Sequence, residues 1–245
     1  MDILIARPYD DAKQLAELFE ASGLSVGILP SIKIVHKKIN LKIENFTDFA
    51  FTSKYAVESL FRQYLPATFV DKSIYSVGAT TANYLRNFSL NAKYPNEYNS
   101  RELFKLISEQ SLSDRKFAIF SGVDGNDYLE KEINKHTICQ KFETYERAFE
   151  SKEFLHTKYL KLWRGKQPKF VITTSIDVFK SLNRIFEKIP APNDSIVTIT
   201  STKMLKFVYS QGFYKTLELE NPSNEHICAK ILQHIEANDY VSREK

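Results

Sequence analysis

Two Thr-Ser pairs, Thr52-Ser53 and Thr174-Ser175, occupy positions where this sequence can bind a ligand. Each pair ends a short apolar run and precedes an amphipathic stretch, which places it at a predicted strand-to-helix turn. A hydroxyl there caps the helix by accepting a hydrogen bond from a first-turn N–H. The same helix end presents unpaired N–H groups and a positive dipole to an anion. Capping alone accounts for the pairs, and anion binding is compatible with it.

Two further turns follow the same pattern. Gly78-Ala79-Thr80 contains a glycine that allows close backbone approach. Thr200-Ser201-Thr202-Lys203 lacks the glycine and gains a cation. Neither turn is a GxGxxG motif or a P-loop, so nucleotide cofactors are not indicated. Ser121-Gly122 has no Lys-Ser/Thr ending and is interpreted as an ordinary turn.

The sequence lacks the motifs of metal sites and of serine-type nucleophilic catalysis. The five histidines show no HxH or HExxH spacing, and no nucleophile elbow is present. Cys139 and Cys228 are far apart and are interpreted as reduced structural residues. Tyr145, in a predicted crossing strand, either faces a ligand or packs on the linker. Arg7, at the end of the first apolar run, either meets an acidic ligand or pairs with a carboxylate.

The net charge of +4 suits an anionic small molecule as well as nucleic acid, but no nucleic-acid-binding signature accompanies it. No apolar run reaches the roughly 18 residues of a membrane span. The first residues lack the basic leader and apolar run of a signal peptide. We therefore expect a cytoplasmic protein that binds neither membrane nor nucleic acid.

The elements that must position these turns alternate between short apolar runs and amphipathic stretches. This pattern predicts parallel sheets covered by helices on both faces, the α/β class. The predicted strands are Ile3–Ala6, Ser25–Leu29, Phe49–Phe51, Ile74–Val77, Phe117–Phe120, Phe170–Ile172 and Ile196–Ile199. The predicted helices are Asp11–Ala21, Ala56–Phe61, Thr81–Phe88, Glu102–Ile107, Tyr128–Ile133, Val178–Phe186, Met204–Tyr209 and Glu225–Ile235.

The sequence also repeats itself. Aligning Thr52 with Thr174 gives an offset of 122 residues (174 − 52), and the same offset places Ile74–Thr80 on Ile196–Thr202. A weaker echo links Ile3–Pro8 with Phe117–Gly122. The repeat predicts two similar α/β domains with a ligand cleft between them. The polar extended segments Ile32–Ile39 and Phe142–Phe149 are the predicted crossings.

The ordered motifs of the chain resemble the uroporphyrinogen-III synthase family. They are Ile3–Pro8, Phe51–Val57, Ser76–Ala82, Tyr145-Glu146-Arg147, Thr174-Ser175, Thr200-Ser201-Thr202 and Asn221-Pro222-Ser223. Thr200 and Ser201 depart from the glycine and proline that the family pattern has at their positions.

The resemblance implies one domain of residues 1–36 plus 150–245 and a second of residues 37–149, joined by a two-stranded linker. It implies a monomeric enzyme without cofactor or metal, in transient contact with the preceding enzyme of its pathway. The substrate would be hydroxymethylbilane, a linear tetrapyrrole with eight carboxylates, cyclised with inversion of the last ring and loss of water. Tyr145 would donate a proton to the leaving hydroxyl. The implied carboxylate contacts are Arg7, Thr52, Ser53, Lys54, Gly78, Ala79, Thr80, Ser121, Gly122, Thr174, Ser175, Ser201, Thr202 and Lys203.

Two alternatives remain open at this point. One is a non-catalytic two-domain module that binds an anionic small molecule. The other is a nucleotide-dependent α/β enzyme, which the missing phosphate loops disfavour. Product analysis with hydroxymethylbilane separates the first alternative from the enzyme.

Overall fold

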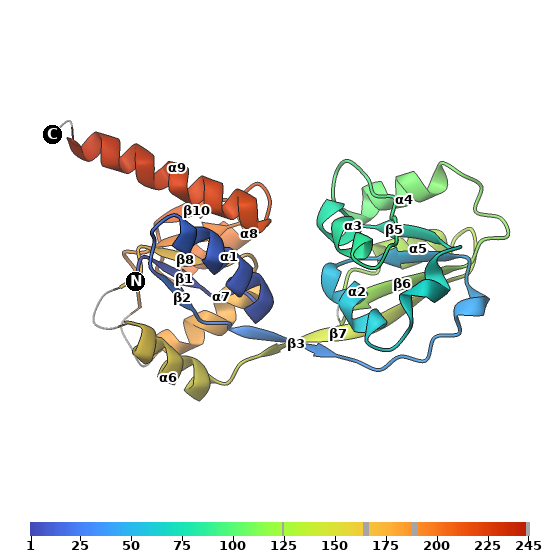
Figure 1. The fold of residues 1–245 in the computed structure, drawn as a ribbon, viewed down its shortest axis with the longest axis horizontal. Coiled ribbons are helices and arrows are strands. Elements are labelled where there is room, and N and C mark those ends of the chain that lie inside the picture. Colours follow the sequence, from blue (N-terminus) through green and yellow to red (C-terminus); the bar gives the residue numbers. More distant parts are fainter. Residues whose placement is uncertain (124, 164–166, 188–190, 244–245) are drawn as a thin grey trace. The chain divides into compact units, whose positions relative to one another are not determined.

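The computed structural model of the chain describes residues 1–123, 125–163, 167–187 and 191–243. These residues form two compact units, each built on its own sheet (Figure 1). Unit 1 comprises Met1–Lys33 and Ala148–Lys245, and unit 2 is the intervening segment Ile34–Arg147. The unit boundaries fall after Lys33 and after Arg147, and the domain division at residues 36 and 149 stays a prediction. Within the described residues, no helix has both the length and the apolar character needed to cross a membrane.

Unit 1 contains a parallel sheet in the order β10-β9-β8-β1-β2. Ile3 of the central strand pairs with Val26 on one side and Phe170 on the other. Because the strands are parallel, the turns that follow them gather at one edge of the sheet. The strands are β1 (Ile3–Ile5), β2 (Val26–Ile28), β8 (Phe170–Ile172), β9 (Ile196–Ile199) and β10 (Thr216–Glu218).

Helices cover both faces of this sheet because side chains alternate along each strand. Leu4 points to the face covered by α6 (Lys152–Trp163), α7 (Ile176–Asn183) and α8 (Thr202–Ser210). Ile3 and Ile5 point to the face covered by α1 (Tyr9–Ala21) and α9 (Asn224–Arg243). Burying each large apolar side chain contributes about 1.5–3 kcal/mol, so these two layers hold the sheet edge in a fixed shape.

Unit 2 also has a five-stranded sheet with helices on both faces, in the strand order β3-β7-β6-β4-β5. Helices α2 and α3 pack over one face of its sheet, and α4 and α5 pack over the other. Its strands are β3 (Ile32–His36), β4 (Asp48–Phe51), β5 (Ser73–Ser76), β6 (Phe117–Gly122) and β7 (Cys139–Phe149). Its helices are α2 (Lys54–Phe61), α3 (Ala79–Arg86), α4 (Ser100–Ser108) and α5 (Tyr128–Ile133).

Aromatic rings fill the α2–α3 side of unit 2. Phe49 and Phe120 stack with centroids 6.2 Å apart, and Phe69 meets Phe49 edge-on at 5.0 Å. Phe51 and Phe120 lie 5.0 Å apart. Such pairs contribute about 0.5–1.5 kcal/mol beyond the burial of their area. They anchor the carboxyl ends of β4 and β6, where the predicted site residues of this unit begin.

Four strands of each unit share one order, β9-β8-β1-β2 in unit 1 and β5-β4-β6-β7 in unit 2, which explains the repeat in the sequence. The fifth strand differs, since β10 lies beside β9 and β3 lies beside β7. β8 and β9 of unit 1 correspond to β4 and β5 of unit 2, and β1 corresponds to β6, the strand of the weaker echo. The offset of 122 holds for the first strand and helix, since α2 and α7 begin at Lys54 and Ile176. The paired strands then differ by one residue: Asp48 pairs with Ser73, whereas Phe170 pairs with Ile196.

The predicted alignment of Ile74–Thr80 with Ile196–Thr202 is therefore wrong by one residue. From β5 and β9 onward the structural offset is 123 (196 − 73), and Gly78 corresponds to Ser201 as the N-cap of the next helix. Identity between Ile74 and Ile196 misled the alignment because the strand register is set by the neighbouring strand.

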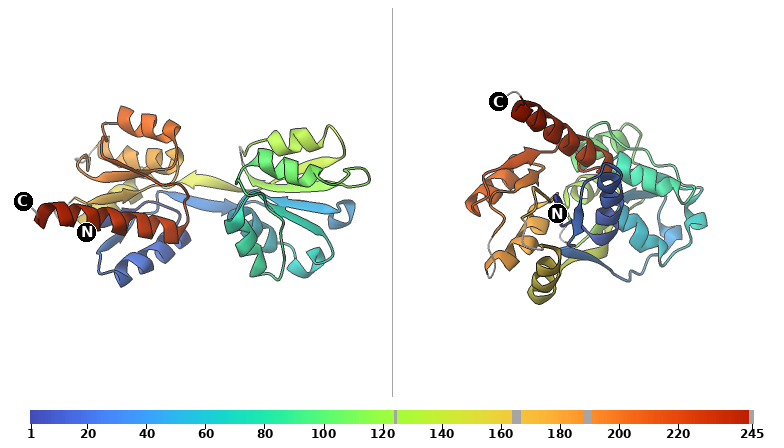
Figure 2. Two further views of the ribbon diagram at one scale, coloured as in Figure 1. Left: turned by 90° about the horizontal axis from the view of Figure 1, so that it is seen from above. Right: turned by 60° about the vertical axis from the view of Figure 1, so that its left-hand side comes forward.

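The predicted crossings correspond to β3 and the second half of β7, which are neighbours in one sheet. The backbone N–H of Lys37 donates to the carbonyl of Thr144 at 2.7 Å, and that of Glu150 donates to Ser31 at 3.0 Å. The residue numbers rise on one strand as they fall on the other, so the pair is antiparallel. The chain thus leaves unit 1 along β3 and returns along β7 (Figures 1 and 2).

Two short 3-10 helices, one α-helix and one edge strand were not predicted. The 3-10 helices are η1 (Ile43–Asn45) and η2 (Pro66–Phe69), whereas η3 (Arg184–Glu187) overlaps the end of the predicted helix Val178–Phe186. Helix α6 and the edge strand β10 also carry no clear signal. β10 has only three residues, Thr216-Leu217-Glu218, and none of them is fully buried.

Candidate functional site

The turn after β4 places Ser53 at the N-terminus of α2. Its hydroxyl oxygen accepts a hydrogen bond from the N–H of Ala56 at 3.2 Å, which confirms the predicted cap. The Thr52 hydroxyl instead donates to the carbonyl of Phe120 at 3.2 Å and ties the turn to β6. Lys54 is the first residue of α2, with its ammonium 5.3 Å from the ring of Tyr55. The turn is thus anchored by the Thr52 and Ser53 hydroxyls.

The turn after β8 has the same construction. Ser175 is the N-cap of α7, and its hydroxyl oxygen accepts from the N–H of Val178 at 3.3 Å. The first N–H groups of an α-helix have no partner within the helix, and the serine satisfies one of them. The remaining first-turn N–H groups point beyond the sheet edge with the positive end of the helix dipole. A carboxylate is a suitable partner for them.

The turn after β9 adjoins that of Thr174. The Thr200 hydroxyl donates to the carbonyl of Thr174 at 3.4 Å and so links the two turns. Ser201 caps α8 by accepting from the N–H of Met204 at 3.2 Å. Thr202 and Lys203 follow it on the exposed first turn. Serine here supplies the cap that the equivalent glycine of unit 2 cannot.

That glycine has a packing role. Gly78 is the N-cap of α3 without a side-chain hydrogen bond, and a Cβ added to it would lie 2.8 Å from Cγ of Tyr98. The ring of Tyr98 therefore packs directly on the turn, although it is 57% exposed. Ala79 is partly exposed and Thr80 is exposed on the first turn of α3.

Tyr145 lies against the same turn as Ser53. The Ser53 hydroxyl donates to the phenol oxygen at 2.9 Å, and Nη2 of Arg147 donates to it at 3.4 Å. Two donors occupy the acceptor positions of the phenol oxygen, so its own proton is directed elsewhere. The ring is 2% exposed and lies 5.7 Å from that of Tyr55. The structure therefore gives Tyr145 the packing role that was weighed for it, with a proton available to a further acceptor.

Gly122 makes room for this ring. The pairing of β6 with β7 slips between Ser121 and Gly122, so that Gly122 lies opposite Tyr145. A Cβ at Gly122 would be 2.8 Å from Cζ of Tyr145. Bulges of this kind re-aim side chains near functional sites. Ser121 itself is 2% exposed, and its hydroxyl donates to the carbonyl of Gly122 at 3.2 Å.

Arg7 is tied down inside unit 1. Its Nη1 donates to Oδ1 of Asn224 at 2.6 Å, and Nη2 lies 3.5 Å from a carboxylate oxygen of Asp11. The residue is 8% exposed, and its Nε has no hydrogen-bond partner in the described part of the chain. Arg7 therefore joins the first turn of α1 to the start of α9, as in the second role considered for it.

The structure thus brings the predicted residues together in two groups, one in each unit. Thr174, Ser175, Ser201, Thr202 and Lys203 gather at the sheet edge of unit 1. Thr52, Ser53, Lys54, Gly122 and Tyr145 gather in unit 2, with Ser121 beneath them. The role of these residues in binding substrate and the predicted ligand position stay predictions.

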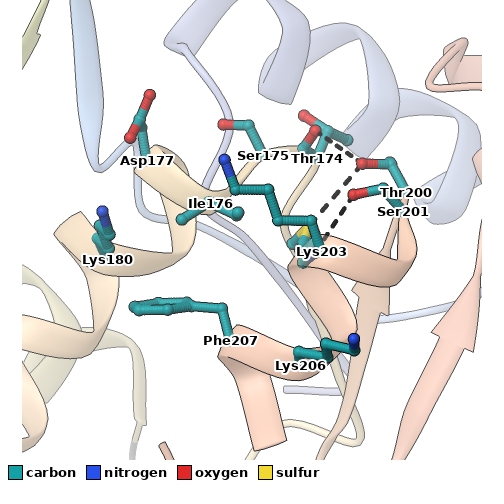
Figure 3. Close-up of a pocket in the computed structure, with 11 residues that line it drawn as sticks. Thr174, Ser175, Ile176, Asp177, Lys180, Thr200, Ser201, Lys203, Lys206 and Phe207 are labelled. Carbon is teal, nitrogen blue, oxygen red and sulfur yellow. Dashed lines mark hydrogen bonds between the residues drawn. The ribbon is translucent and has the colours of Figure 1, made fainter. Parts of the chain in front are cut away.

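Sequence reasoning missed the residues that extend the unit 1 group. A pocket of about 660 Å³ continues from the two turns between α7 and α8, where Lys180, Lys206 and Phe207 line it (Figure 3). Lys203 and Lys206 are three residues apart and so share one face of α8, but their proximity to Lys180 depends on how α7 and α8 pack. Arg147, two residues beyond Tyr145 on β7, was also missed as its partner.

Comparisons with known proteins agree with this architecture. A protein of Methanocaldococcus jannaschii, provisionally named a uroporphyrinogen-III synthase, is 25% identical over 233 residues, covering 90% of this chain and 95% of its own. The crystal structure of the Helicobacter pylori uroporphyrinogen-III synthetase is similar in fold, with a TM-score of 0.66 at 16% identity. That likeness covers 96% of this chain and 99% of the other.

A mutant uroporphyrinogen III synthase of Thermus thermophilus has the same fold, with a TM-score of 0.55 at 14% identity. It is matched over 98% of this chain and 99% of its own. The family model described as uroporphyrinogen-III synthase HemD matches residues 13–228, which include nearly all the turns described above. The chain belongs to the uroporphyrinogen-III synthase family.

Proposed function

We propose that this chain converts hydroxymethylbilane into uroporphyrinogen III in tetrapyrrole and haem biosynthesis, with inversion of ring D and loss of water. The observation that carries the proposal is the family match over residues 13–228. The capped turns in both units support it, since each offers hydroxyl and N–H donors suited to carboxylates. The enzyme is a cofactor-independent cyclising lyase.

The main task of the protein in this reaction is positioning. Hydroxymethylbilane closes unaided to the uninverted isomer, so the enzyme must hold the chain such that attack on the inverted ring wins. Holding reacting groups in place contributes on the order of 7–11 kcal/mol in favourable cases. In this proposal, turns of both units bind carboxylates: Thr52 to Lys54 and Gly78 to Thr80 in unit 2, and Thr174-Ser175 and Ser201 to Lys203 in unit 1.

Tyr145 is the proposed proton donor. The hydroxyl of the substrate leaves with its bonding electrons and takes up a proton to become water, while a pyrrole nitrogen supplies the electron pair that replaces them. The donors from Ser53 and Arg147 at 2.9 and 3.4 Å stabilise the phenol oxygen as negative charge develops on it. Because the phenol is 2% exposed, this role requires the covering side chains to move when substrate binds.

Arg7, Ser121 and Gly122 have different parts in this proposal. Arg7 and Ser121 are buried and shape the turns through their internal hydrogen bonds. Gly122 provides the space that Tyr145 occupies. In this proposal the protein acts as a monomer in the cytoplasm and makes transient contact with the preceding enzyme of the pathway.

Product analysis tests the function directly. Purified protein is supplied with hydroxymethylbilane, the products are oxidised, and the type I and type III porphyrins are separated. We expect type III to dominate with enzyme and type I without it. Type I alone in the presence of enzyme would sink the catalytic proposal and favour a non-catalytic module that binds an anionic small molecule.

A further inference from the structure

The pocket between α7 and α8 has the chemistry of a site for an acidic aromatic ring. Its volume of about 660 Å³ lies within the range of roughly 300–1,000 Å³ typical of small-molecule sites. Phe207 and Ile176 provide apolar walls, and the capped turns of Ser175 and Ser201 form the upper rim. Figure 3 shows Phe207 below these turns, with Lys180 on one side and Lys203 extending toward α7.

The pocket is strongly basic. Lys180, Lys203 and Lys206 line it, and the acidic residue among its lining side chains is Asp177. In the part of the chain that the structure describes, none of these three lysines forms an ion pair with a carboxylate. The ammonium of Lys180 instead lies 5.3 Å from the ring centroid of Phe207. The three ammonium groups are therefore available to an anionic ligand. Their concave setting concentrates the positive potential inside the pocket.

The corrected register of the repeat gives an internal comparison. Lys180 corresponds to Glu58 at the offset of 122 shared by α7 and α2. Lys203 and Phe207 correspond to Thr80 and Tyr84 at the offset of 123 shared by α8 and α3. The aromatic ring is thus kept in both units, whereas the cations are present only in unit 1.

Glu58, the residue of unit 2 that corresponds to Lys180, already has partners within its own unit. Glu58 contacts Nη2 of Arg62 at 2.8 Å and Nε2 of His36 at 3.5 Å. Its place in unit 1 is taken by a lysine without such partners, on a helix with the same start and length. A difference of charge on a shared scaffold indicates that the two units bind different parts of a ligand.

The geometry points to the α7–α8 pocket as the subsite for one pyrrole ring of the substrate, with Lys180 and Lys203 binding its two carboxylates and Phe207 stacking on the ring. This inference rests on the proposed function, because that substrate carries eight carboxylates on four rings, two on each. An electron-rich ring also attracts the ammonium of Lys180. In this proposal Lys180 and Phe207 contribute to substrate specificity, although both lie on helices and outside the strand-to-helix turns.

The test combines kinetics with binding of a single ring. Lys180→Glu installs the residue of unit 2 at an exposed position, so folding is preserved. Lys13→Glu is the matched control, since Lys13 is an exposed lysine of α1 on the opposite face of the same sheet. For both variants, KM, kcat and the isomer ratio are measured with hydroxymethylbilane. Binding of a pyrrole bearing one acetate and one propionate is followed by amide chemical shifts.

We expect Lys180→Glu to raise KM and the dissociation constant of the single pyrrole by about tenfold. An attraction that strengthens binding by a few-fold is lost, and repulsion between two carboxylates takes its place. The value of kcat changes less than twofold, as expected for loss of uniform binding. Shifts in the wild type are confined to α7 and α8, and a pyrrole with methyl groups in place of both carboxylates binds the two proteins equally. Lys13→Glu matches the wild type.

Equal KM and equal pyrrole affinity in Lys180→Glu and Lys13→Glu would overturn the subsite while leaving the proposed function intact. If the wild type yields type I product alone but Lys180→Glu still loses pyrrole binding, the proposed function fails and the pocket stands as a site for an acidic pyrrole. The two failures are therefore distinguishable.

Discussion

The hydroxyl of Ser53 donates a hydrogen bond to the phenol oxygen of Tyr145 across 92 residues of sequence, at 2.9 Å. The same oxygen of Ser53 accepts from the N–H of Ala56. One side chain therefore fixes both the start of α2 and the orientation of the proposed proton donor. The β6–β7 bulge at Gly122 completes this arrangement by admitting the ring.

Replacing Tyr145 by Phe removes the proposed proton donor and keeps the ring. We expect kcat to fall on the order of 10²-fold, at the lower end of general acid catalysis, while type III product still forms. The measurement is the initial rate with isomer analysis. Tyr214→Phe, at a 70% exposed tyrosine, serves as the control. A Tyr145→Phe rate equal to that of the wild type would make the tyrosine purely structural.

Replacing Gly122 by Ala tests the fit of the ring. The new Cβ would lie 2.8 Å from Cζ of Tyr145, so the ring must shift. We expect the free energy of unfolding to fall by about 1–3 kcal/mol, as in other overpacked sites. Urea unfolding measures it. In a Tyr145→Ala background, Gly122→Ala should lower the unfolding free energy by less. An equal decrease in both backgrounds would show that contact with the Tyr145 ring is not its cause.

Ser53→Ala and Ser175→Ala form a matched pair, since both serines cap equivalent helices. Each change should lower the unfolding free energy by about 1 kcal/mol through loss of the cap. Ser53→Ala also removes a hydrogen bond to the phenol oxygen of Tyr145. We therefore expect the kcat of Ser53→Ala to be about tenfold lower than that of Ser175→Ala, with KM measured separately for each variant. Identical kcat values for the two variants would argue against a role for the Ser53–Tyr145 bond.

Cys139 predicts a pH dependence of stability. Burial, with a smaller effect of Glu130, raises the pKa of its thiol from 9.0 to about 12. The unfolded chain therefore loses this proton first as the pH rises, and the stabilisation that is complete below pH 9 is lost between pH 9 and 12. At about pH 10.5 the loss is about 2 kcal/mol. Cys139→Ala, compared with wild type at pH 8 and pH 10.5, should lack this decline, and parallel declines would refute the assignment.

The apolar runs of the sequence predicted most of the fold, because buried parallel strands need continuous apolar residues. Phe170–Ile172 and Ile196–Ile199 form strands with the predicted bounds. Thr216–Glu218 was missed because an edge strand buries little of its surface. The register error after Thr52 arose because residue identity carries no information about strand pairing.

The helix caps were predictable because Ser followed by an amphipathic stretch is a local signal. The partners of Arg7 and Tyr145 were not, since Asn224 and Ser53 lie 217 and 92 residues away. The lysines of the α7–α8 pocket became visible only when two helices were set side by side at their true register. Local chemistry was therefore accessible from the sequence, and long-range contacts required the fold.

The discontinuity of unit 1 imposes an order on folding during synthesis. The central strand β1 pairs with β8, whose residues are synthesised only after the last residue of unit 2. Unit 2 is one uninterrupted segment, and its sheet can close as soon as β7 has emerged. The nascent N-terminal strand, helix and second strand must then wait, with one sheet edge unpaired, for the C-terminal half of their own domain. Translation pauses and chaperones should therefore act on this chain chiefly between completion of Arg147 and emergence of Ile199.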